Sequence, residues 1–401
     1  MAITKIDITM LEDVTGANNL VKLDANAKIP ACSGASLSVK PGPTKSASDP
    51  AIDSNKSLGA EWLNTTDGEM FICTDATTDE NVWTNVGAGS GDIVPWPSYT
   101  FQAENYGFTV GGSSPAIGWS NIIGRFSISA GGSSTDHGDL SAASGYGAGF
   151  NAETYGYVAL GYLAPSPNYD AQVDKFAFAS NVTSTNHCQL SVARSLVAAS
   201  YNETHGYSAG GRISDPSASN VIDKFAFDST STATDWGDIG SVRYGGSPCS
   251  SATHGYHNTG QDGSDGYIQT IYKYPFASNA GSTGHGNLNI SGGGKYGGAG
   301  ASDISGGYGF HCAGSGGGYS KEINKYSLSS NTTASDHGDL SGNGRYGMGG
   351  ISGASHGFIL GGYQTGGGGN YIDKFAYASN TTATDVADMT VARSSNGANG
   401  Y

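Results

Sequence analysis

The sequence predicts an all-β protein in which a short N-terminal part precedes a large array of similar β-sheets. Three observations support this fold class. The 401 residues include 64 glycines and 23 tyrosines but only 13% charged residues, a composition typical of short strands joined by tight turns. Three short motifs recur in the same order after residue 98. Residues 1–98 lack these motifs, which divides the chain into two parts.

The first motif is a glycine that follows a tyrosine or histidine and precedes an aromatic residue. Its six copies are Tyr106-Gly107-Phe108, Tyr155-Gly156-Tyr157, His205-Gly206-Tyr207, His254-Gly255-Tyr256, Tyr308-Gly309-Phe310 and His356-Gly357-Phe358. The second motif is a basic residue followed by an aromatic one. Its copies are Arg125-Phe126, Lys175-Phe176, Lys224-Phe225, Lys273-Tyr274, Lys325-Tyr326 and Lys374-Phe375.

The third motif is a polar turn that ends in an aliphatic residue, and the spacing of all three motifs sets the size of the unit. The turns end at Leu140, Leu190, Ile239, Leu288, Leu340 and Met389. The aromatic residues of the second motif are separated by 50, 49, 49, 52 and 49 residues. A period near 50 is typical of the four-stranded blades of kelch-like propellers. We therefore expect a six-bladed β-propeller over residues 99–401.

The two ends of the array indicate how such a ring would close. The array opens near Tyr99 with the first motif and stops at Tyr401, just after the third motif of the sixth unit. We expect the N-terminal strand around residues 99–110 to close the last blade, in one sheet with residues 373–389, so that no edge stays open. The alternative is an open stack of repeats, which needs capping units at both ends.

Charge and hydropathy narrow the classes of partner. The formal net charge is −15, and phosphate binding needs a basic surface, so we expect no nucleic-acid partner. No apolar run reaches the length of a membrane span, and no signal peptide follows Met1, so we expect no membrane insertion and synthesis in a cytoplasm. Five scattered cysteines without CxxC spacing indicate free thiols. They are Cys32, Cys73, Cys188, Cys249 and Cys312.

The N-terminal part contains two segments with a recognisable pattern. Residues 19–31 are a leucine- and lysine-containing stretch that runs into Pro30, and Ser33-Gly34-Ala35-Ser36-Leu37 follows. Residues 59–73, together with Val82-Trp83, flank an Asp67-Gly68 pair that predicts a β-hairpin. Both segments resemble modules of phage tail-fibre proteins, and the repeat with its Lys-Phe motif resembles repeats in tail proteins of marine phages.

The resemblance implies a virion appendage that is made in the host cytoplasm. We expect an attachment segment and linker over residues 1–57, a hairpin module and linker over residues 58–98, and the propeller over residues 99–401. Fibre modules of this kind are usually trimeric, so a homo-oligomer, a trimer, held through residues 1–98 is expected. The alternative is that this region docks on other virion tail proteins and is disordered until then.

One position of the repeat carries a basic residue in five of the six units. These residues are Arg194, Arg243, Lys295, Arg345 and Arg393, with Ser144 in the first unit. A residue present in nearly every blade is expected to be structural and to pair with an Asp of the third motif. The Asp residues in question are Asp139, Asp238, Asp339 and Asp388. The alternative is a ring that binds anions.

The stretches between the first and second motifs differ most from unit to unit and are rich in aromatic residues. They contain Trp119, Tyr162, Tyr169, Tyr267, Tyr319, Tyr363 and Tyr371 beside Asn and Asp residues. Aromatic faces next to amides and carboxylates suit sugar rings, and variable loops on a rigid scaffold are where binding usually resides. These residues are the candidate ligand-binding set; the alternative is that they cover blade edges.

Nothing in the sequence predicts catalysis, a metal or a cofactor. Ser134, Asp136 and Gly138 partly match the Asp-box turn of sialidases, but that turn is structural and its closing Trp is missing. Asp136 and Asp139 are too few for calcium, so turn capping is the expected role. We therefore expect a virion receptor-binding protein for a host-surface polysaccharide. The alternatives are a glycan-degrading propeller enzyme and a non-binding structural or capsid decoration protein.

Overall fold

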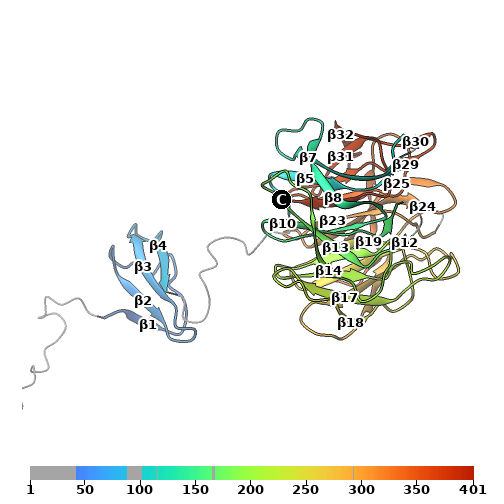
Figure 1. Cartoon of the computed structure of the whole chain (residues 1–401). Helices are drawn as coiled ribbons and strands as arrows, with labels where there is room; N and C mark the ends of the chain where they lie inside the picture. The colour runs from blue at the N-terminus through green and yellow to red at the C-terminus, as the bar shows by residue number, and fades with distance from the viewer. Residues whose placement is uncertain (1–41, 88–101, 115, 165–167, 292) are drawn as a thin grey trace, which may run out of the picture. The chain divides into compact units, whose positions relative to one another are not determined.

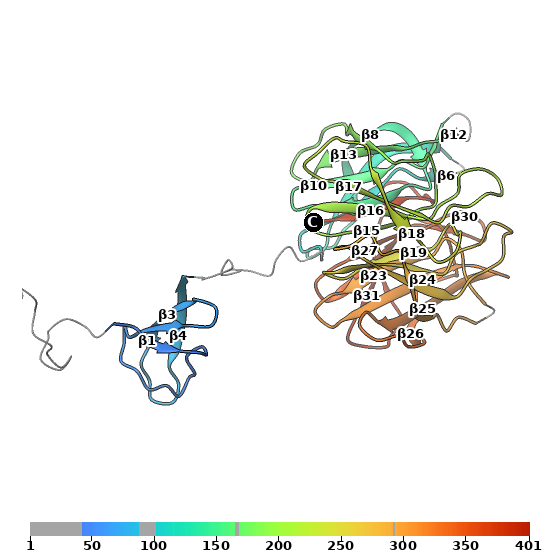
Figure 2. The same cartoon turned by 90° about the horizontal axis from the view of Figure 1, so that it is seen from below.

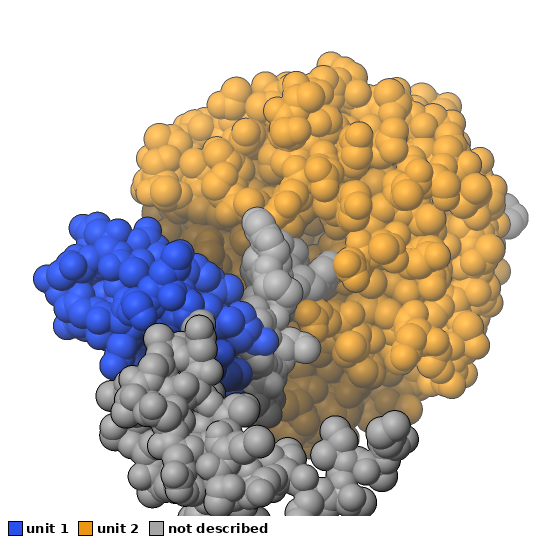
Figure 3. Space-filling view, turned by 90° about the vertical axis from the view of Figure 1, so that its left-hand side faces the viewer, with its two compact units in different colours: residues 1–98 blue, residues 99–401 orange. Residues whose placement is uncertain are grey.

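The computed structural model describes residues 42–87, 102–114, 116–164, 168–291 and 293–401. The chain divides into two compact units, unit 1 over residues 1–98 and unit 2 over residues 99–401, which Figure 3 distinguishes by colour. Every regular element in the described ranges is a β-strand, as the sequence predicted (Figure 1). None of these residues belongs to a helix of the length and hydropathy that crossing a membrane requires.

Unit 1 is a small four-stranded sheet. Its strands are β1 (Thr44–Ser46), β2 (Glu61–Asn64), β3 (Met70–Asp75) and β4 (Val82–Gly87), in that order. The hairpin of β2 and β3 turns at Gly68, whose φ of 82° favours glycine. β1 pairs with β2 in parallel, and Asn55 donates a hydrogen bond to Asp79, so this sheet recruits residues before 58. Residues 1–41 and Cys32 lie outside the described residues.

Unit 2 contains six sheets of at least four strands within its described residues. The first has the order β33 (Gly397–Gly400), β5 (Tyr106–Val110), β7 (Gly118–Ser127), β8 (Thr135–Gly145), β11 (Tyr162–Leu163) and β12 (Asn168–Tyr169), and β6 (Ser113–Ser114) pairs with β7. The second is β9 (Ala148–Asn151), β10 (Tyr155–Ala159), β13 (Gln172–Ala177) and β14 (Thr185–Gln189). The third is β15 (Ala198–Tyr201), β16 (His205–Ala209), β17 (Val221–Ala226) and β18 (Thr234–Asp238).

The remaining sheets repeat the same order. The fourth is β19 (Ser247–Ser250), β20 (His254–Asn258), β21 (Thr270–Pro275) and β22 (Thr283–Asn287). The fifth is β23 (Ala299–Asp303), β24 (Tyr308–Ser315), β25 (Tyr319–Ser327) and β26 (Ser335–Asp339). The sixth is β27 (Gly349–Ser352), β28 (His356–Leu360), β31 (Tyr371–Ala376) and β32 (Thr384–Asp388), beside a small ribbon of β29 (Tyr363–Gln364) and β30 (Gly367–Gly368). Repeated antiparallel sheets of this kind are propeller-like (Figures 1 and 2).

The first two motifs are two halves of one cross-strand pair. Gly156 lies opposite Phe176, and Gly206 lies opposite Phe225. A Cβ on Gly206 would come within 2.3 Å of the Phe225 ring, so the ring occupies the space that a side chain would need. The same pairing recurs in every unit. The pairs are Gly107–Phe126, Gly156–Phe176, Gly206–Phe225, Gly255–Tyr274, Gly309–Tyr326 and Gly357–Phe375. Aromatic packing over a strand glycine explains why the motifs recur together.

The first strands of the sheets, which we call the inner strands, contact one another around a common axis. They are β33, β9, β15, β19, β23 and β27, and each contacts the next in that order, with β27 contacting β33. Small residues make this approach possible. A Cβ on Gly300 would lie 1.7 Å from the carbonyl oxygen of Pro248, and one on Gly350 would lie 2.2 Å from that of Gly300.

The predicted pairing at the ends of the array is wrong. β5 does not share a sheet with residues 373–389, because β31 pairs with β28 and β32. β5 pairs instead with β33, and Val110 lies opposite Gly397. The physical reason is the phase of the unit. The inner strand of each sheet follows the third motif of the preceding unit. Residues 397–400 follow the third motif of the sixth unit, so this C-terminal strand is the inner strand of the first sheet and pairs with β5.

Candidate ligand-binding site

The basic position lies between neighbouring sheets and is buried. The side chains of Arg194, Arg243, Arg345 and Arg393 have 0% exposure, and Lys295 has 4%. Each reaches into the next sheet. Arg194 donates to the Asp223 carboxylate at 2.7 Å and to the carbonyl oxygen of Val221 at 3.2 Å. Arg345 pairs with Asp373 in the same way. A buried position that already has such acceptors cannot form a surface ring for anions.

The expected partner of these arginines was also wrong. The carboxylates belong to Asp223 and Asp373, which directly precede the basic residue of the second motif, and not to the Asp of the third motif. Sequence spacing could not show this, because the pairs cross from one sheet to the next. Arg243 faces the Tyr272 ring at 4.4 Å and donates to the carbonyl oxygen of Thr270 at 2.9 Å. Burial lowers the pKa of Arg243 to about 10, against the effect of Tyr272.

A ring of six backbone hydrogen bonds, which we call the mouth ring, lies at the start of the inner strands. The N–H of each residue donates to the carbonyl oxygen of its counterpart in the neighbouring sheet at 2.6–3.0 Å. Going from donor to acceptor, its members are Tyr146, Ser395, Gly347, Gly297, Gly245 and Leu196, and Leu196 donates to Tyr146. All six have positive φ, between 56° and 68°. Three are not glycine, and this conformation costs such residues about 1–3 kcal/mol.

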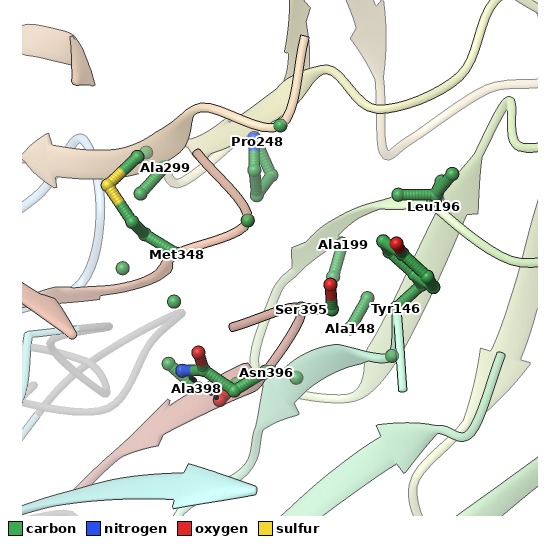
Figure 4. Close-up of a pocket in the computed structure, with 18 of the residues that line it drawn as sticks. Tyr146, Ala148, Leu196, Ala199, Pro248, Ala299, Met348, Ser395, Asn396 and Ala398 are labelled. Carbon is green, nitrogen blue, oxygen red and sulfur yellow. Dashed lines mark hydrogen bonds between the residues drawn. The ribbon is translucent and has the colours of Figure 1, made fainter. Parts of the chain in front are cut away.

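Beneath the mouth ring the inner strands enclose a cavity of about 100 Å³. Its lining is mostly glycine and alanine, with Pro248, Met348 and Asn396 among the larger residues (Figure 4). Tyr146, a member of the mouth ring, also lines this cavity (Figure 4). The described lining contains no carboxylate, histidine or cysteine, so the cavity offers an apolar, narrow space and not a set of acid–base groups.

Aromatic side chains surround the mouth in two arcs, which together we call the aromatic crown. The first arc is Trp119, Tyr146, Tyr162 and Tyr169, with ring centroids 4.6–6.3 Å apart. The second is Tyr244, Tyr296, Tyr346, Tyr319 and Tyr363, with centroids 5.5–6.2 Å apart. Tyr296 packs where a Cβ on Gly245 would stand, 2.3 Å from it, so the glycine of the mouth ring makes room for the ring of the next sheet.

Several hydroxyl groups of the crown are buried or hydrogen-bonded. Burial raises the pKa of Tyr296 well above its usual value, and the neighbouring Tyr146, Tyr346 and Tyr244 raise it further, while Arg212 opposes them. Burial and the hydrogen bond to Asp265 raise the pKa of Tyr244. The Tyr162 hydroxyl donates to that of Tyr169 at 2.7 Å. Burial also raises the pKa of Tyr162, so the hydroxyl groups of Tyr296, Tyr244 and Tyr162 are neutral at physiological pH.

Five of the seven candidate aromatic residues belong to the crown, and Tyr267 and Tyr371 do not. Trp119, Tyr162, Tyr169, Tyr319 and Tyr363 belong to the crown. Tyr267 is 48% exposed beside it, whereas Tyr371 covers the guanidinium of Arg345 at 5.0 Å, as a blade-edge role requires.

Sequence reasoning missed five residues of this region. They are Tyr146, Tyr244, Tyr296, Tyr346 and Arg212. One signal was present in the sequence. A basic residue, a tyrosine and a glycine recur as Arg243-Tyr244-Gly245, Lys295-Tyr296-Gly297 and Arg345-Tyr346-Gly347.

The third motif packs one sheet against the next. The Asp136 carboxylate accepts the N–H of Gly138 at 2.9 Å, which confirms the expected turn capping. His137 bonds the carbonyl oxygen of Ala177, in the next sheet, at 3.1 Å. Among the described residues, one acidic group could approach a metal: Asp49, Asp67 and Glu69 of unit 1, whose ligand atoms lie within 4.8 Å. Asn64 already donates to Asp49 and Asp67, and no catalytic group stands beside them.

The opposite end of the inner strands is polar and holds both ends of unit 2. Ser302 Oγ accepts the N–H of Ser250 at 3.0 Å, and Ser352 Oγ accepts that of Ser302 at 2.8 Å. Gln102 donates to the carbonyl oxygen of Ser302, and the carbonyl oxygen of Tyr401 accepts the N–H of Tyr106. Gln102 and Tyr401 therefore lie at the end of the inner strands opposite the aromatic crown.

Comparison with known proteins bears on the fold. No family model and no curated protein matches the chain. Solved structures do match, and one of them is the structure of YjhT, with a TM-score of 0.51 and 11% sequence identity. The match covers 63% of this chain and 86% of that one. Identity this low shows similarity of fold alone, and it supports an all-β, propeller-like unit 2.

Proposed function

We propose that this chain is the receptor-binding protein of a phage tail fibre or other virion appendage. Unit 2 is a closed six-bladed propeller that attaches to a host-surface polysaccharide through its aromatic crown, and residues 1–98 join it to other virion tail proteins. One observation carries the proposal. Nine aromatic side chains gather at one end of the inner strands, around the mouth ring, while Gln102 and Tyr401 lie at the opposite end.

Ring closure is supported by contacts that join the array's two ends. β33 completes the first sheet by pairing with β5. Asn399 on β33 then donates to the carbonyl oxygen of Phe150 at 2.7 Å and to Asn151 Oδ1 at 2.9 Å, which connects the first sheet to the second. The mouth ring has a donor and an acceptor from each of the six sheets, so it leaves no unpaired edge at the axis.

A sugar ligand is supported by the crown's chemistry. Pyranose rings have an apolar C–H face that packs on aromatic rings, and hydroxyl edges that need nearby donors and acceptors. Tyrosine supplies both a ring face and a hydroxyl at low conformational cost. Tyr146 adds a further argument, because it keeps a side chain at a position where three sheets use glycine. Leu196 and Ser395 share this conformation, so the feature that distinguishes Tyr146 is its aromatic ring beside the cavity.

Self-association through the N-terminal region is supported by the poor burial within unit 1. Cys73 is its sole buried apolar side chain among residues 42–87, while Ile52, Leu58 and Val82 are 66%, 69% and 52% exposed. Trp62 and Trp83 pack on each other at 5.8 Å but stay partly exposed. So small a core is marginal alone. We propose a trimer, which would also present three crowns and add their weak contacts.

The test of function compares two matched substitutions in the mouth ring. Tyr146→Gly removes the crown side chain and relieves the positive φ, so folding is retained. Leu196→Gly makes the same backbone change in the neighbouring sheet without removing an aromatic ring. We expect the wild type and Leu196→Gly to bind host-surface polysaccharide in a pull-down, and Tyr146→Gly to lose that binding. Equal binding by all three proteins would refute the crown as the site.

The competing functions have separate readouts. Time-dependent release of reducing ends from the polysaccharide would make the chain an enzyme. Failure to bind any host glycan, with tight assembly of residues 1–98 onto the virion, would make it a spacer or decoration. Antibody labelling of virions by electron microscopy tests the virion location. Sedimentation of the full chain against a chain beginning at Pro95 tests the trimer, since loss of oligomerisation on truncation is expected.

A further inference from the structure

Arg212 occupies the gap between the two arcs of the aromatic crown. Its guanidinium lies 5.0 Å from the centre of the Tyr244 ring in the second arc. Electrostatic interaction also couples Arg212 to Tyr162 and Tyr169 in the first arc. Its backbone pairs with Ser195, the residue before the mouth-ring position Leu196, which fixes where the side chain starts. Arg212 is thus a cation held among crown rings, unlike the arginines buried between the sheets.

The polar groups of Arg212 are only partly used. Its Nη2 donates to Asp215 Oδ1, and its Nε is buried without a hydrogen-bond partner. Asp215 is 79% exposed at the same pair, so its carboxylate keeps free acceptor capacity toward solvent. The Arg212 side chain is 19% exposed, so part of its guanidinium is open to a ligand oxygen. The pair therefore offers a partly exposed guanidinium next to a carboxylate with free acceptor capacity.

The charges around this pair weigh against an acidic ligand. The loops of residues 162–170, 212–218 and 261–267 contain Asp170, Asp215, Asp262 and Asp265 against the single cation Arg212. Asp265 accepts the hydrogen bond of the Tyr244 hydroxyl, which places a carboxylate directly at the crown. The whole chain has a net charge of −15. An anionic polysaccharide would be repelled both over long range and at the loops.

We propose that the crown binds an uncharged sugar, whose neighbouring hydroxyl groups bridge Arg212 and Asp215 while its ring stacks on the crown. This inference rests on the proposed glycan-binding function. One hydroxyl accepts from the exposed part of the Arg212 guanidinium, and the next donates to the Asp215 carboxylate. Arg212 and Asp215 thus determine specificity for neutral glycans, and the aromatic rings supply the apolar contact.

The test uses the full chain and two sets of purified polymers. The neutral set is dextran, mannan and galactan, and the acidic set is polygalacturonate and alginate. Variants are Arg212→Lys, which keeps the charge but not the planar fork, and Asp215→Asn, which alters an exposed carboxylate. Arg125→Lys and Asp136→Asn are matched controls, because Arg125 covers Tyr106 and Asp136 caps a turn, both away from the mouth. Near-ultraviolet circular dichroism verifies the fold of each protein.

We expect binding of a neutral polymer that hardly changes between 50 and 500 mM salt. Arg212→Lys and Asp215→Asn should each weaken it about tenfold or more, because each removes a hydrogen bond to a charged group, while the controls bind as the wild type does. Preferential binding of the acidic set, strengthened by Asp215→Asn and weakened by salt, would overturn the inference and leave the proposed function standing. Neutral binding that is indifferent to both variants would also overturn it. If the neutral polymers, the acidic polymers and host polysaccharide all fail to bind, the proposed function itself is refuted.

Discussion

Replacing Arg194 with serine should be among the most destabilising single changes in unit 2. The Asp223 carboxylate is completely buried and accepts hydrogen bonds from Arg194 at 2.7 Å and from the N–H of Ser191 at 2.9 Å. Without the guanidinium it becomes an uncompensated buried charge. Breaking such a pair from one side costs about 3–5 kcal/mol. We expect the free energy of unfolding to fall by that amount.

Between the first two sheets, a buried aspartate is already stabilised without an arginine. Ser144 occupies the basic position there, and the buried Asp174 has no arginine. Three side-chain donors replace it: the hydroxyls of Ser141 and Ser184 and the amide of Gln172, at 3.0 Å or less.

Two of these donors have apolar counterparts around Asp223. Ser184 corresponds to Ala233, and Gln172 corresponds to Val221. Adding Val221→Gln and Ala233→Ser to Arg194→Ser recreates the donors of Asp174. We expect this triple variant to recover more than half of the lost stability.

The assay is urea-induced unfolding of the full chain, followed by the near-ultraviolet circular dichroism of tyrosine. All 23 tyrosines lie after residue 98, so the tyrosine contribution to this signal reports unit 2. Asp339→Asn is the control, because its pair with Lys321 is partly exposed and such pairs are worth about 1 kcal/mol or less. An Arg194→Ser variant as stable as this control would refute the reasoning. Failure of the triple variant to recover stability would show that the donors around Asp174 do not replace an arginine.

Three further predictions follow from packing and burial. Gly300→Ala should destabilise unit 2 by more than about 3 kcal/mol, because the new Cβ would lie 1.7 Å from the Pro248 carbonyl oxygen. Gly284→Ala is the control: a Cβ there has no atom within 4 Å, so this variant should unfold in urea almost as the wild type does. The free energy of unfolding should fall as the pH drops from 6.5 toward 4, because burial lowers the pKa of His311 to about 4 and the unfolded chain therefore binds the proton first. This histidine alone accounts for about 3 kcal/mol. A His311→Gln variant should have a flatter pH profile of urea midpoints. Burial raises the pKa of the Cys188, Cys249 and Cys312 thiols, to about 12 for Cys188. These thiols should therefore react with Ellman's reagent only after denaturation. Rapid reaction in native buffer would contradict their burial.

The sequence by itself determined the repeated all-β fold of unit 2, for a local reason. A glycine on one strand and an aromatic residue on the neighbouring strand must occur together, because the ring fills the space that the glycine leaves open. Such pairs lie within one unit, so they appear as motifs with a fixed spacing. The Asp67-Gly68 turn of unit 1 and the capping role of Asp136 were predictable for the same reason, since each depends on residues a few positions apart.

The tertiary structure alone decided which residues meet across sheets. Arg194 pairs with Asp223 and Asn399 bonds Phe150 because neighbouring sheets face each other, and no spacing in the chain records which partner a side chain reaches. The mouth ring, and with it the position of Tyr146 over the cavity, depends on where all six inner strands converge. The candidate site is therefore a property of the packed sheets: each unit contributes a residue or two, and only the contacts between inner strands bring these residues together.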